Sequence, residues 1–398
     1  MHTPDFDVVV VGLGAMGAAT LYQLAKRGVK VLGIDRFTPP HDLGSSHGDT
    51  RITRQAVGEG AAYVPLAIRS QQIWRELESE LESELDVQLF EQCGVLVMTS
   101  SATAPAADSA ADFTKHSIEL ARRNGIEHEV LDAAQIRQRF PQFAPIHDSA
   151  LGYFEPGGGY VRPERCIEAQ LTRAQALGAT WIGGETVTAL ANEDGLVRIT
   201  SQGRSVTAGK AIVCAGMWSS ELLGAPFDQL LRVCRQTLYW FKLAQPTPFA
   251  PRSPSFIIHG ASEAETCYGF PPVPGEGSMK IATEQYSATS LPDTLDRQVS
   301  SAEAEQMYRQ LVAVNFTGVT PQLVKSAVCA YTVTPDSGFI IDQHPRLANV
   351  TVVSACSGHG FKHSAAIGEA LAQRCVDGRS DVDLSAFSLQ RFSSGQAL

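Results

Sequence analysis

The segment that most constrains the fold of this chain lies near its N-terminus. Four consecutive valines, Val8 to Val11, are typical of a buried parallel strand, and Gly12-Leu13-Gly14-Ala15-Met16-Gly17 follows them directly. The pattern then predicts a helix from about Ala15 to Arg27, ended by Gly28, and a second strand from Val29 to Ile34. A strand, a tight turn, a helix and another strand form a β-α-β unit, so we expect an α/β domain.

The glycines of this segment match G-x-G-x-x-G, the pattern of a dinucleotide-binding turn. The first glycine permits the turn, the second lets the backbone approach a pyrophosphate, and the third lets helix and strand pack closely. Asp35 follows the second strand, about 20 residues after Gly14, where an acid is expected to hold ribose hydroxyls. The pattern does not separate NAD from FAD. We expect the dinucleotide to contact Gly12, Gly14, Met16, Gly17, Asp35 and Arg36.

Composition narrows the partners and the location of such a chain. Its 398 residues include 42 acidic and 32 basic side chains, a net charge of −10, which argues against nucleic acid or an anionic membrane as partner. The uncharged run from Val8 to Ala25 is better explained by the strand and helix above than by a membrane span, and no basic leader precedes it. We therefore expect a cytoplasmic protein. The eight cysteines show neither a CxxC pair nor metal-ligand spacing, which predicts reduced thiols and no metal site.

Four further segments resemble, in the same order, motifs of the monomeric sarcosine oxidase and N-methyltryptophan oxidase family. They are residues 44–54 (GSSHGDTRITR), 156–163 (PGGGYVRP), 329–334 (CAYTVT) and 357–362 (SGHGFK). The resemblance extends from about residue 5 to about residue 378. It implies a D-amino-acid-oxidase-like α/β fold, in which a β-rich substrate-binding domain is inserted into a Rossmann-like FAD-binding domain. We expect the FAD-binding domain at 1–85, 150–222 and 325–398, and the substrate-binding domain at 86–149 and 223–324.

The same resemblance implies an FAD-dependent oxidase of secondary amino acids that are N-methylated or cyclic. The C–N bond is oxidised to an imine, oxygen is reduced to hydrogen peroxide, and water hydrolyses the imine. It also implies a monomer. Three alternatives stay open. The flavin enzyme could pass its electrons to a quinone or a partner protein. The chain could be a non-catalytic flavoprotein subunit. It could also be an NAD-dependent dehydrogenase, which the motifs around Cys329 and Lys362 disfavour.

The resemblance assigns flavin-side roles to several residues. His47 and Arg51 match the basic groups close to the flavin ring, and Cys329 matches the cysteine that carries FAD through a thioether at the 8α position. A loop-capping histidine, a surface ion pair and a buried free thiol are the ordinary structural interpretations of these three residues. The remaining expected flavin contacts are Ser45, Thr50, Gly358, His359, Gly360 and Lys362.

The substrate side is assigned in the same way. Arg54 and Lys362 match a clamp for the substrate carboxylate, although each could instead form an ordinary ion pair. Lys280 matches the lysine that activates oxygen, with an edge-strand lysine as the alternative. Tyr268 and Tyr331 match tyrosines that line the substrate, with a role in the core as the alternative. We thus expect Lys280, Arg51, His47, Tyr331 and Tyr268 to be catalytic.

One position departs from the family pattern. Four residues after the lysine, sarcosine-specific members carry a histidine, and this chain has Glu284. We therefore expect a substrate surface different from that of a sarcosine specialist. Trp240 and Phe241 either shape a larger apolar pocket or belong to the core.

Overall fold

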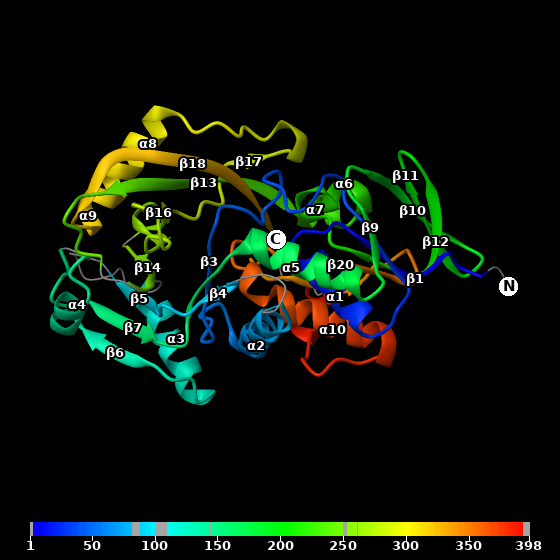
Figure 1. Cartoon of the computed structure of the whole chain (residues 1–398), viewed down its shortest axis with the longest axis horizontal. Coiled ribbons are helices and arrows are strands. Elements are labelled where there is room, and N and C mark those ends of the chain that lie inside the picture. Colours follow the sequence, from blue (N-terminus) through cyan, green and yellow to red (C-terminus); the bar gives the residue numbers. More distant parts are fainter. Residues whose placement is uncertain are drawn as a thin grey trace.

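The computed structural model describes residues 3–81, 88–99, 110–143, 145–249, 253–260 and 262–392. In this part of the chain the strands form two large sheets that lie side by side, together with one small sheet between them (Figure 1). The N-terminal β-α-β unit belongs to the sheet on the right of the view. The β-rich half that the sequence predicts lies on the left.

The first sheet contains the predicted dinucleotide turn. Its adjacent strands β9, β2, β1, β12 and β20 run parallel, and β10, β11 and β19 add antiparallel pairs at its margins. The bounds are β1 (Phe6–Val11), β2 (Val31–Ile34), β9 (Thr180–Ile182), β10 (Val187–Glu193), β11 (Leu196–Ser201), β12 (Ser205–Val213), β19 (Ile340–Gln343) and β20 (Val350–Ser354).

Both faces of the first sheet are covered, which explains the continuous valine run of β1. Val8 and Val10 pack in a core with helices on one face, and Val9 and Val11 pack with Leu223 on the other. The helices around this sheet are α1 (Ala15–Lys26), α2 (Val64–Leu81), α5 (Pro163–Ala176), α6 (Ser219–Leu223), α7 (Phe227–Leu230) and α10 (Ser364–Asp377).

The second sheet is largely antiparallel and supplies most of the second half of the molecule. Its order is β17-β13-β16-β15-β14-β5-β7-β6, and β18 also pairs with β13. The bounds are β5 (Val95–Thr99), β6 (Glu129–Asp132), β7 (Leu151–Glu155), β13 (Arg232–Leu243), β14 (Ser255–His259), β15 (Cys267–Phe270), β16 (Ser278–Ala282), β17 (Thr289–Ser290) and β18 (Val319–Val333). Its helices are α3 (Ala110–Arg123), α4 (Ala133–Arg139), α8 (Ser301–Met307) and α9 (Ala313–Asn315). The small sheet consists of β3 (Arg51–Thr53), β4 (Phe90–Glu91) and β8 (Gly159–Val161).

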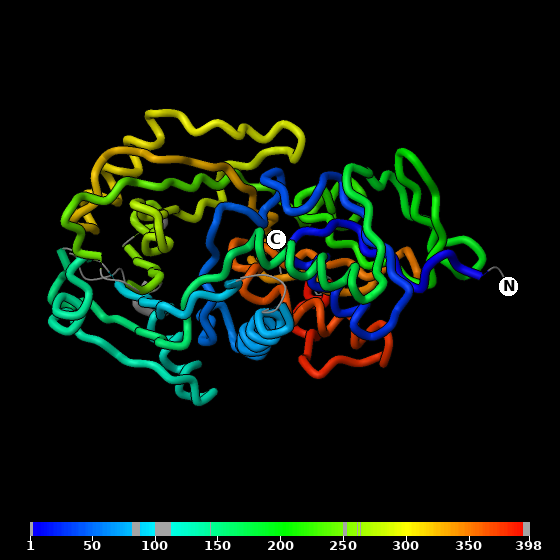
Figure 2. The backbone as a smooth tube through the Cα atoms, viewed as in Figure 1, coloured from blue at the N-terminus to red at the C-terminus, as the bar shows by residue number. Residues whose placement is uncertain are grey.

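Strands β13 and β18 run together along the upper side of the molecule and end near the first sheet (Figure 2). The motif 329–334 lies at that end of β18. The domain limits drawn from the sequence stay a proposal. Two strands are relevant to these limits. Strand β18 crosses the proposed boundary between residues 324 and 325. Strand β7 falls in a segment proposed for the FAD-binding domain, but it pairs with strands of the second sheet.

Most predicted elements occur within one to three residues of their expected bounds. The four-residue spacing of Leu77, Leu81 and Leu85 predicts a helix over 67–89. The observed helix is α2, which ends at Leu81; residues 82–87 lie outside the described part of the chain. The sequence also predicts one helix over 303–314, but a π-helical segment at Tyr308–Val312 separates α8 from α9 there.

Candidate active site

The glycine turn after β1 is built as its sequence predicts. Gly12 has φ of +86°, and a Cβ atom there would lie 2.5 Å from the carbonyl oxygen of Cys214. A Cβ atom on Gly17 would lie 1.7 Å from the carbonyl oxygen of Gly12, so only glycine fits at both positions. Gly14 is different: its Cβ direction meets only Ser46 Oγ, at 3.5 Å, and its backbone faces a cavity at the N-terminus of α1.

Asp35 lies in the same cavity, at the end of β2. Its carboxylate accepts hydrogen bonds from the backbone N–H of Leu13 at 2.6 Å and of Phe37 at 2.8 Å. Through its bond to Leu13, the buried carboxylate of Asp35 therefore also fixes the glycine turn after β1. Arg36 lines the cavity beside it, pairs with Asp293 at 3.0 Å, and stacks over the ring of Trp218.

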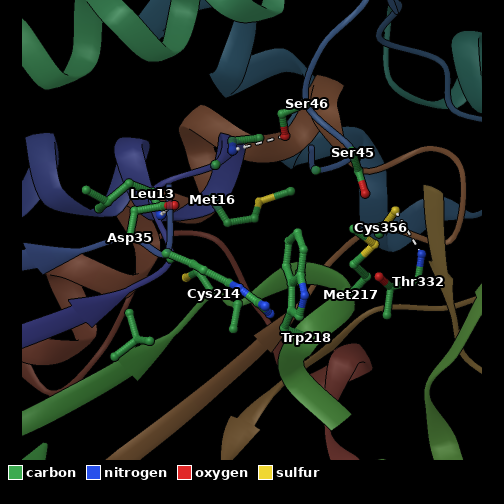
Figure 3. A pocket seen from close by; sticks show the side chains of 18 of the residues that line it. Leu13, Met16, Asp35, Ser45, Ser46, Cys214, Met217, Trp218, Thr332 and Cys356 are labelled. Atoms are coloured by element: carbon green, nitrogen blue, oxygen red, sulfur yellow. Dashed lines mark hydrogen bonds between the residues drawn. The ribbon is translucent and has the colours of Figure 1, made fainter. Parts of the chain in front are cut away.

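These residues line a cavity of about 400 Å³ at the carboxyl ends of the parallel strands, the usual place for a dinucleotide. Met16 and Trp218 both point into it (Figure 3). The cavity extends from the Asp35 end to Arg51 and Tyr331 on the side of the second sheet. An open glycine backbone at a helix N-terminus, a buried acid and a long, mostly apolar lining fit FAD. The expected cofactor contacts that line it are Gly12, Gly14, Met16, Asp35, Arg36, Ser45, Arg51, Gly358 and Gly360.

A second cavity, of about 330 Å³, adjoins the first. The two share Arg51, Tyr331, Gly358 and Phe361 as lining residues. Gly358 has φ of +86°, and a Cβ atom there would lie 3.0 Å from the Tyr331 ring and from the Tyr286 hydroxyl. Glycine thus keeps the wall between the cavities thin. A ligand in the first cavity and a small molecule in the second would meet at this wall.

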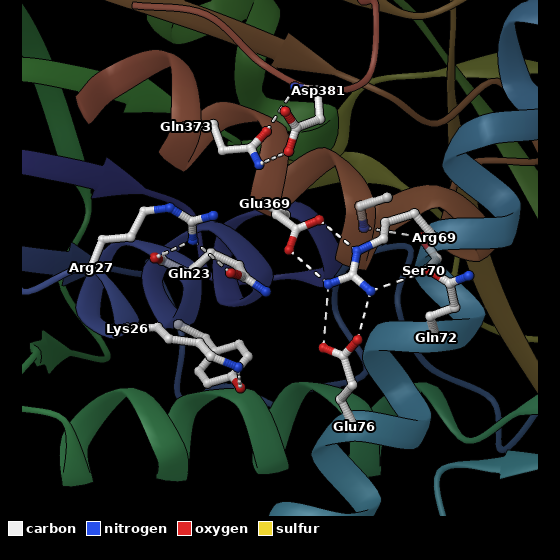
Figure 4. Close-up of polar contacts among 12 residues, drawn as sticks. Gln23, Lys26, Arg27, Arg69, Ser70, Gln72, Glu76, Glu369, Gln373 and Asp381 are labelled. Carbon is white, nitrogen blue, oxygen red and sulfur yellow. Dashed lines mark hydrogen bonds and ion pairs between the residues drawn. The ribbon is translucent and has the colours of Figure 1, made fainter. Parts of the chain in front are cut away.

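The turn 357–362 is held between the end of strand β20, which precedes it, and helix α10, which follows it. A Cβ atom on Gly360 would lie 1.8 Å from the carbonyl oxygen of Ala355, so the turn packs directly on β20. Helix α10 is fixed to α2 through Arg69, which pairs with Glu369 at 2.7 Å (Figure 4). His359, an expected flavin contact, lines the second cavity rather than the first; its Nε2 lies 3.1 Å from the carbonyl oxygen of Ser337, and its ring stacks on Phe339.

Arg51 lines both cavities, and Lys280, which lines neither, shares the carbonyl oxygen of Thr50 with it. Arg51 donates to the carbonyl oxygens of Thr50 and Ser45, each at 2.9 Å. The ammonium of buried Lys280 donates to the carbonyl oxygens of Gly48 at 2.5 Å and Thr50 at 2.9 Å. Burial, reinforced by the charge of Arg51, holds the pKa of Lys280 well below its ordinary value.

His47 is placed differently from Arg51 and Lys280. It lines a third, smaller cavity, which also contacts Trp240, and its Nε2 is buried without a hydrogen-bond partner among the described residues. Burial and the charge of Arg51 lower the pKa of His47 to about 3. The imidazole is thus neutral at physiological pH. Trp240 lies beneath Lys280, whose ammonium is 5.2 Å from its ring, and Phe241 packs in the core of the second sheet.

The two residues predicted to clamp a carboxylate lie together in the second cavity, and an internal acid pairs with both. Arg54 is buried and donates to Glu59 at 2.9 Å, and Lys362 lies 3.4 Å from the other oxygen of Glu59. Although burial favours the neutral acid, these two cations hold the pKa of Glu59 well below its usual value. Arg54 Nε has no hydrogen-bond partner among the described residues. The group therefore carries one net positive charge and a spare donor.

Tyrosine hydroxyls and one further acid complete the second cavity. The hydroxyl oxygens of Tyr268 and Tyr331 lie 3.3 Å apart. Glu284 accepts a hydrogen bond from Tyr286 at 3.0 Å, and burial, reinforced by Glu59, raises the pKa of Glu284 to about 6. Glu284, which stands where sarcosine-specific members carry a histidine, thus lines the cavity.

Cys329 lines the second cavity from β18 and is buried. Burial raises the pKa of its thiol, and the charges of Arg51 and Lys280 oppose that rise. All eight cysteines are free thiols, and Cys356 lines the first cavity.

Sequence reasoning missed three residues of the site: Glu59, Tyr286 and His259. The signal for Glu59 was its place between two glycines, five residues after Arg54. Tyr286 follows Glu284 by two residues, so the same face of an extended segment predicts its contact. Nothing in the local sequence points to His259.

Two further properties of the structure concern metal binding and membrane insertion. Among the described residues, no cluster of His, Cys, Asp and Glu side chains is arranged to hold a metal ion. Within the same ranges, no helix combines the length and the apolar character that crossing a bilayer requires.

Comparisons with known proteins agree with this geometry. Residues 7–374 match the model of the FAD dependent oxidoreductase family. Monomeric sarcosine oxidase from Bacillus sp. (strain NS-129) is 39% identical over 390 residues, which cover 97% of each chain. N-methyl-L-tryptophan oxidase from Yersinia pestis (strain Pestoides F) is 31% identical over 389 residues, which cover 98% of this chain and 100% of that protein.

Solved structures share the fold. NikD, an amino acid oxidase of nikkomycin biosynthesis, superposes with a TM-score of 0.81 at 23% identity and covers 97% of this chain and 98% of its own. Glycine oxidase from Geobacillus kaustophilus has a TM-score of 0.75 at 20% identity, covering 98% and 99%. These matches confirm the D-amino-acid-oxidase-like fold and the family resemblance of the sequence motifs. The chain belongs to the FAD-dependent oxidoreductase family, within the group of monomeric sarcosine oxidases and N-methyltryptophan oxidases.

Proposed function

We propose that this FAD-dependent oxidoreductase is an oxidase of secondary amino acids that are N-methylated or cyclic. The observation that carries the proposal is the clamp of Arg54 and Lys362 in a cavity that shares a wall with the dinucleotide cavity. The clamp's single net positive charge matches one carboxylate. The 31–39% identity to oxidases named for sarcosine and N-methyl-L-tryptophan supports the same substrate class.

FAD, when bound, accepts a hydride equivalent from the C–H bond next to the amine nitrogen and passes two electrons to oxygen. The chain's own residues bind and orient the substrate for that transfer. Arg54 and Lys362 hold the carboxylate, which leaves the amine directed toward Tyr331 and the shared wall. Loss of a hydride, two electrons and one proton, from the neutral amine gives an iminium ion, and loss of the N–H proton gives the imine. The two electrons and two protons are the complement that turns one oxygen into hydrogen peroxide, and water hydrolyses the imine to an amine and a carbonyl compound.

Four residues at or beside the junction have proposed roles in the redox steps. Arg51 places a fixed positive charge where negative charge develops on the cofactor side of the wall. Lys280, held by the carbonyl oxygens of Gly48 and Thr50, stabilises as an ammonium the negative charge that forms as oxygen accepts electrons. Tyr268 and Tyr331 supply hydroxyl groups at the substrate. His47 lies behind this group in the third cavity and, being neutral, supports the loop rather than supplying a charge.

We further propose that Cys329 carries the flavin through a thioether at the 8α position. Its place in the lining of the second cavity, near Arg51 and Tyr268, supports this link. A sulfur link prevents loss of the cofactor. The proposal also includes a monomer that releases hydrogen peroxide in the cytoplasm.

The test is an anaerobic reduction assay with the purified holoprotein. N-methyl amino acids and cyclic secondary amino acids should bleach the flavin absorbance, and air should restore it with one hydrogen peroxide formed per amine. Persistence of the colour with every secondary amino acid would refute the proposal. Bleaching without peroxide in air, with rapid turnover on a quinone, would support a dehydrogenase in its place.

A further inference from the structure

The second cavity contains an acid that the clamp does not explain. Glu284 follows β16, and one of its oxygens accepts a hydrogen bond from Tyr286. Among the described residues, its other oxygen has no hydrogen-bond partner, and no Lys, Arg or His forms an ion pair with it. Arg54 and Lys362 line the same cavity, but both are engaged by Glu59. A half-buried carboxylate with no cation of its own is costly to keep ionised unless a ligand supplies the cation.

Glu284 belongs to a polar row across the floor of the cavity. In the sheet, Ala282 of β16 lies opposite Tyr268 of β15, which lies opposite Ile257 of β14. Two residues further along each strand direction, on the same face, come Glu284, Thr266 and His259, and all three line the cavity. Glu284 lies four residues along the chain from Lys280, about 13 Å at the rise of an extended strand. The Glu284 end of the row adjoins Tyr286, whose hydroxyl lies beside Gly358 of the shared wall, and the His259 end packs on Phe113, with 4.7 Å between the ring centroids.

Two members of the row, Glu284 and His259, offer hydrogen-bonding capacity that the protein itself does not use. His259 Nε2 is buried and has no hydrogen-bond partner among the described residues. The Thr266 hydroxyl is already engaged, because it donates to the carbonyl oxygen of Ser262 at 3.1 Å and accepts from the backbone N–H of Gly260 at 3.3 Å, and it can only accept a further hydrogen bond. Burial, with the charge of Arg54, lowers the pKa of His259 to about 4, so its ring is neutral. A neutral imidazole, a hydroxyl and a carboxylate together suit a group that donates hydrogen bonds and carries positive charge.

The charges of the cavity decide which part of a substrate this row serves. Glu59 offsets one of the two clamp cations, and the substrate carboxylate offsets the other. Arg51 also lines the cavity, but it lies at the shared wall, where its charge serves the cofactor side. The reacting amine is neutral when it loses hydride, because its lone pair must be free to form the imine. The charge of Glu284 therefore remains unmatched by a simple N-methyl amino acid. A positive charge on the substrate side chain would match it.

We propose that Glu284, Thr266 and His259 form a subsite for a cationic side chain, so that the preferred substrate is a secondary α-amino acid with a basic side chain. This inference rests on the proposed oxidase function and specifies its substrate class. The free volume of the cavity, about 330 Å³, accommodates such a side chain. Nα-methyl-L-lysine has this chemistry.

The test compares Nα-methyl-L-lysine with Nα-methyl-L-norleucine, which has the same chain length and no side-chain charge. Anaerobic flavin reduction at increasing substrate concentration gives a rate constant and an apparent Kd for each. We expect the wild type to favour the lysine derivative by at least about tenfold in the ratio of rate constant to Kd. In Glu284→Gln, which keeps the shape and removes the charge, this preference should fall to about one.

Two further variants keep the test decisive. Glu284→Asp retains a carboxylate and should keep part of the preference even if the glutamine variant folds poorly. Glu276→Gln removes an exposed acid at the opposite end of β16 and should keep the full preference. Equal use of both substrates by the wild type would overturn the subsite. An equal loss on both substrates in Glu284→Gln would overturn it as well, since the carboxylate would then serve the reacting amine.

Failure of the subsite and failure of the oxidase function give different results. If neutral N-methyl amino acids bleach the flavin and the lysine derivative does not, only the subsite is refuted. If no secondary amino acid of either kind bleaches it, the oxidase function is refuted, and the subsite with it.

Discussion

Replacement of Arg54 by alanine should weaken the binding of every ligand held through a carboxylate. The side chain is 1% exposed, and its guanidinium donates to the carbonyl oxygen of Ala56 at 2.5 Å and to Glu59 at 2.9 Å. Truncating one partner of a buried, hydrogen-bonded charge pair costs about 2–4 kcal/mol. This corresponds to a loss of affinity of roughly 30- to 1,000-fold. Lys362 still lies beside Glu59 in the variant, so some affinity for carboxylates should remain.

The assay compares a carboxylate inhibitor with its neutral amide, each titrated against the flavin absorbance. The wild type should prefer the carboxylate, and Arg54→Ala should lose most of that preference while it binds the amide with similar affinity. Arg54→Lys keeps the charge without the two-pronged geometry and should fall between them. Arg198→Ala breaks an exposed ion pair with Glu193 and serves as control, because such pairs contribute little. The same ratio of carboxylate to amide affinity in Arg54→Ala and in the wild type would refute the clamp.

Three other predictions concern the cofactor, oxygen and pH. Cys329→Ser should release its flavin on acid denaturation, whereas the wild type should keep the colour with the protein; a flavin that stays attached to the variant would exclude this sulfur. Lys280→Met should slow reoxidation by air roughly 100-fold and leave anaerobic reduction largely intact; equal losses in both steps would contradict an oxygen-specific role. Since the pKa of Glu284 is raised to about 6, the affinity for a basic substrate should be full above about pH 7 and fall as the pH drops below about 6, where the acid becomes neutral. A constant affinity across this range would contradict that assignment. The groups that face Glu284 are Glu59, Arg54, Lys362, Tyr268, Tyr286 and Tyr331.

The N-terminal unit was predictable because its determinants are local. Gly12, Gly17 and the valines of β1 specify a turn and a buried strand whatever the rest of the chain does, and Asp35 lies where that unit needs an acid. The positions of Arg54, Lys362 and Tyr331 in one cavity were predictable only through the family motifs. Arg54 directly follows β3, Lys362 lies in the turn before α10, and Tyr331 belongs to β18. No local sequence pattern relates these three segments.

The remaining features depend on tertiary packing. The pairing of Glu59 with two cations requires the loop after β3 to fold back onto the turn before α10. The polar row requires the registers of β14, β15 and β16, which are set by the neighbouring strands rather than by their own residues. The neutral state of His47 follows from burial, which its sequence neighbours do not reveal.

The partition formed by Arg51, Tyr331, Gly358 and Phe361 has a consequence for how this scaffold can acquire new substrates. A substitution there alters two ligands at once, because each of these residues lines both chambers. A substitution at or just beyond the ends of β14 and β16, such as position 259 or 284, changes a residue that lines only the chamber for the amine donor. Engineering for altered selectivity should therefore begin at the ends of β14, β15 and β16, where diversity leaves the redox partner untouched.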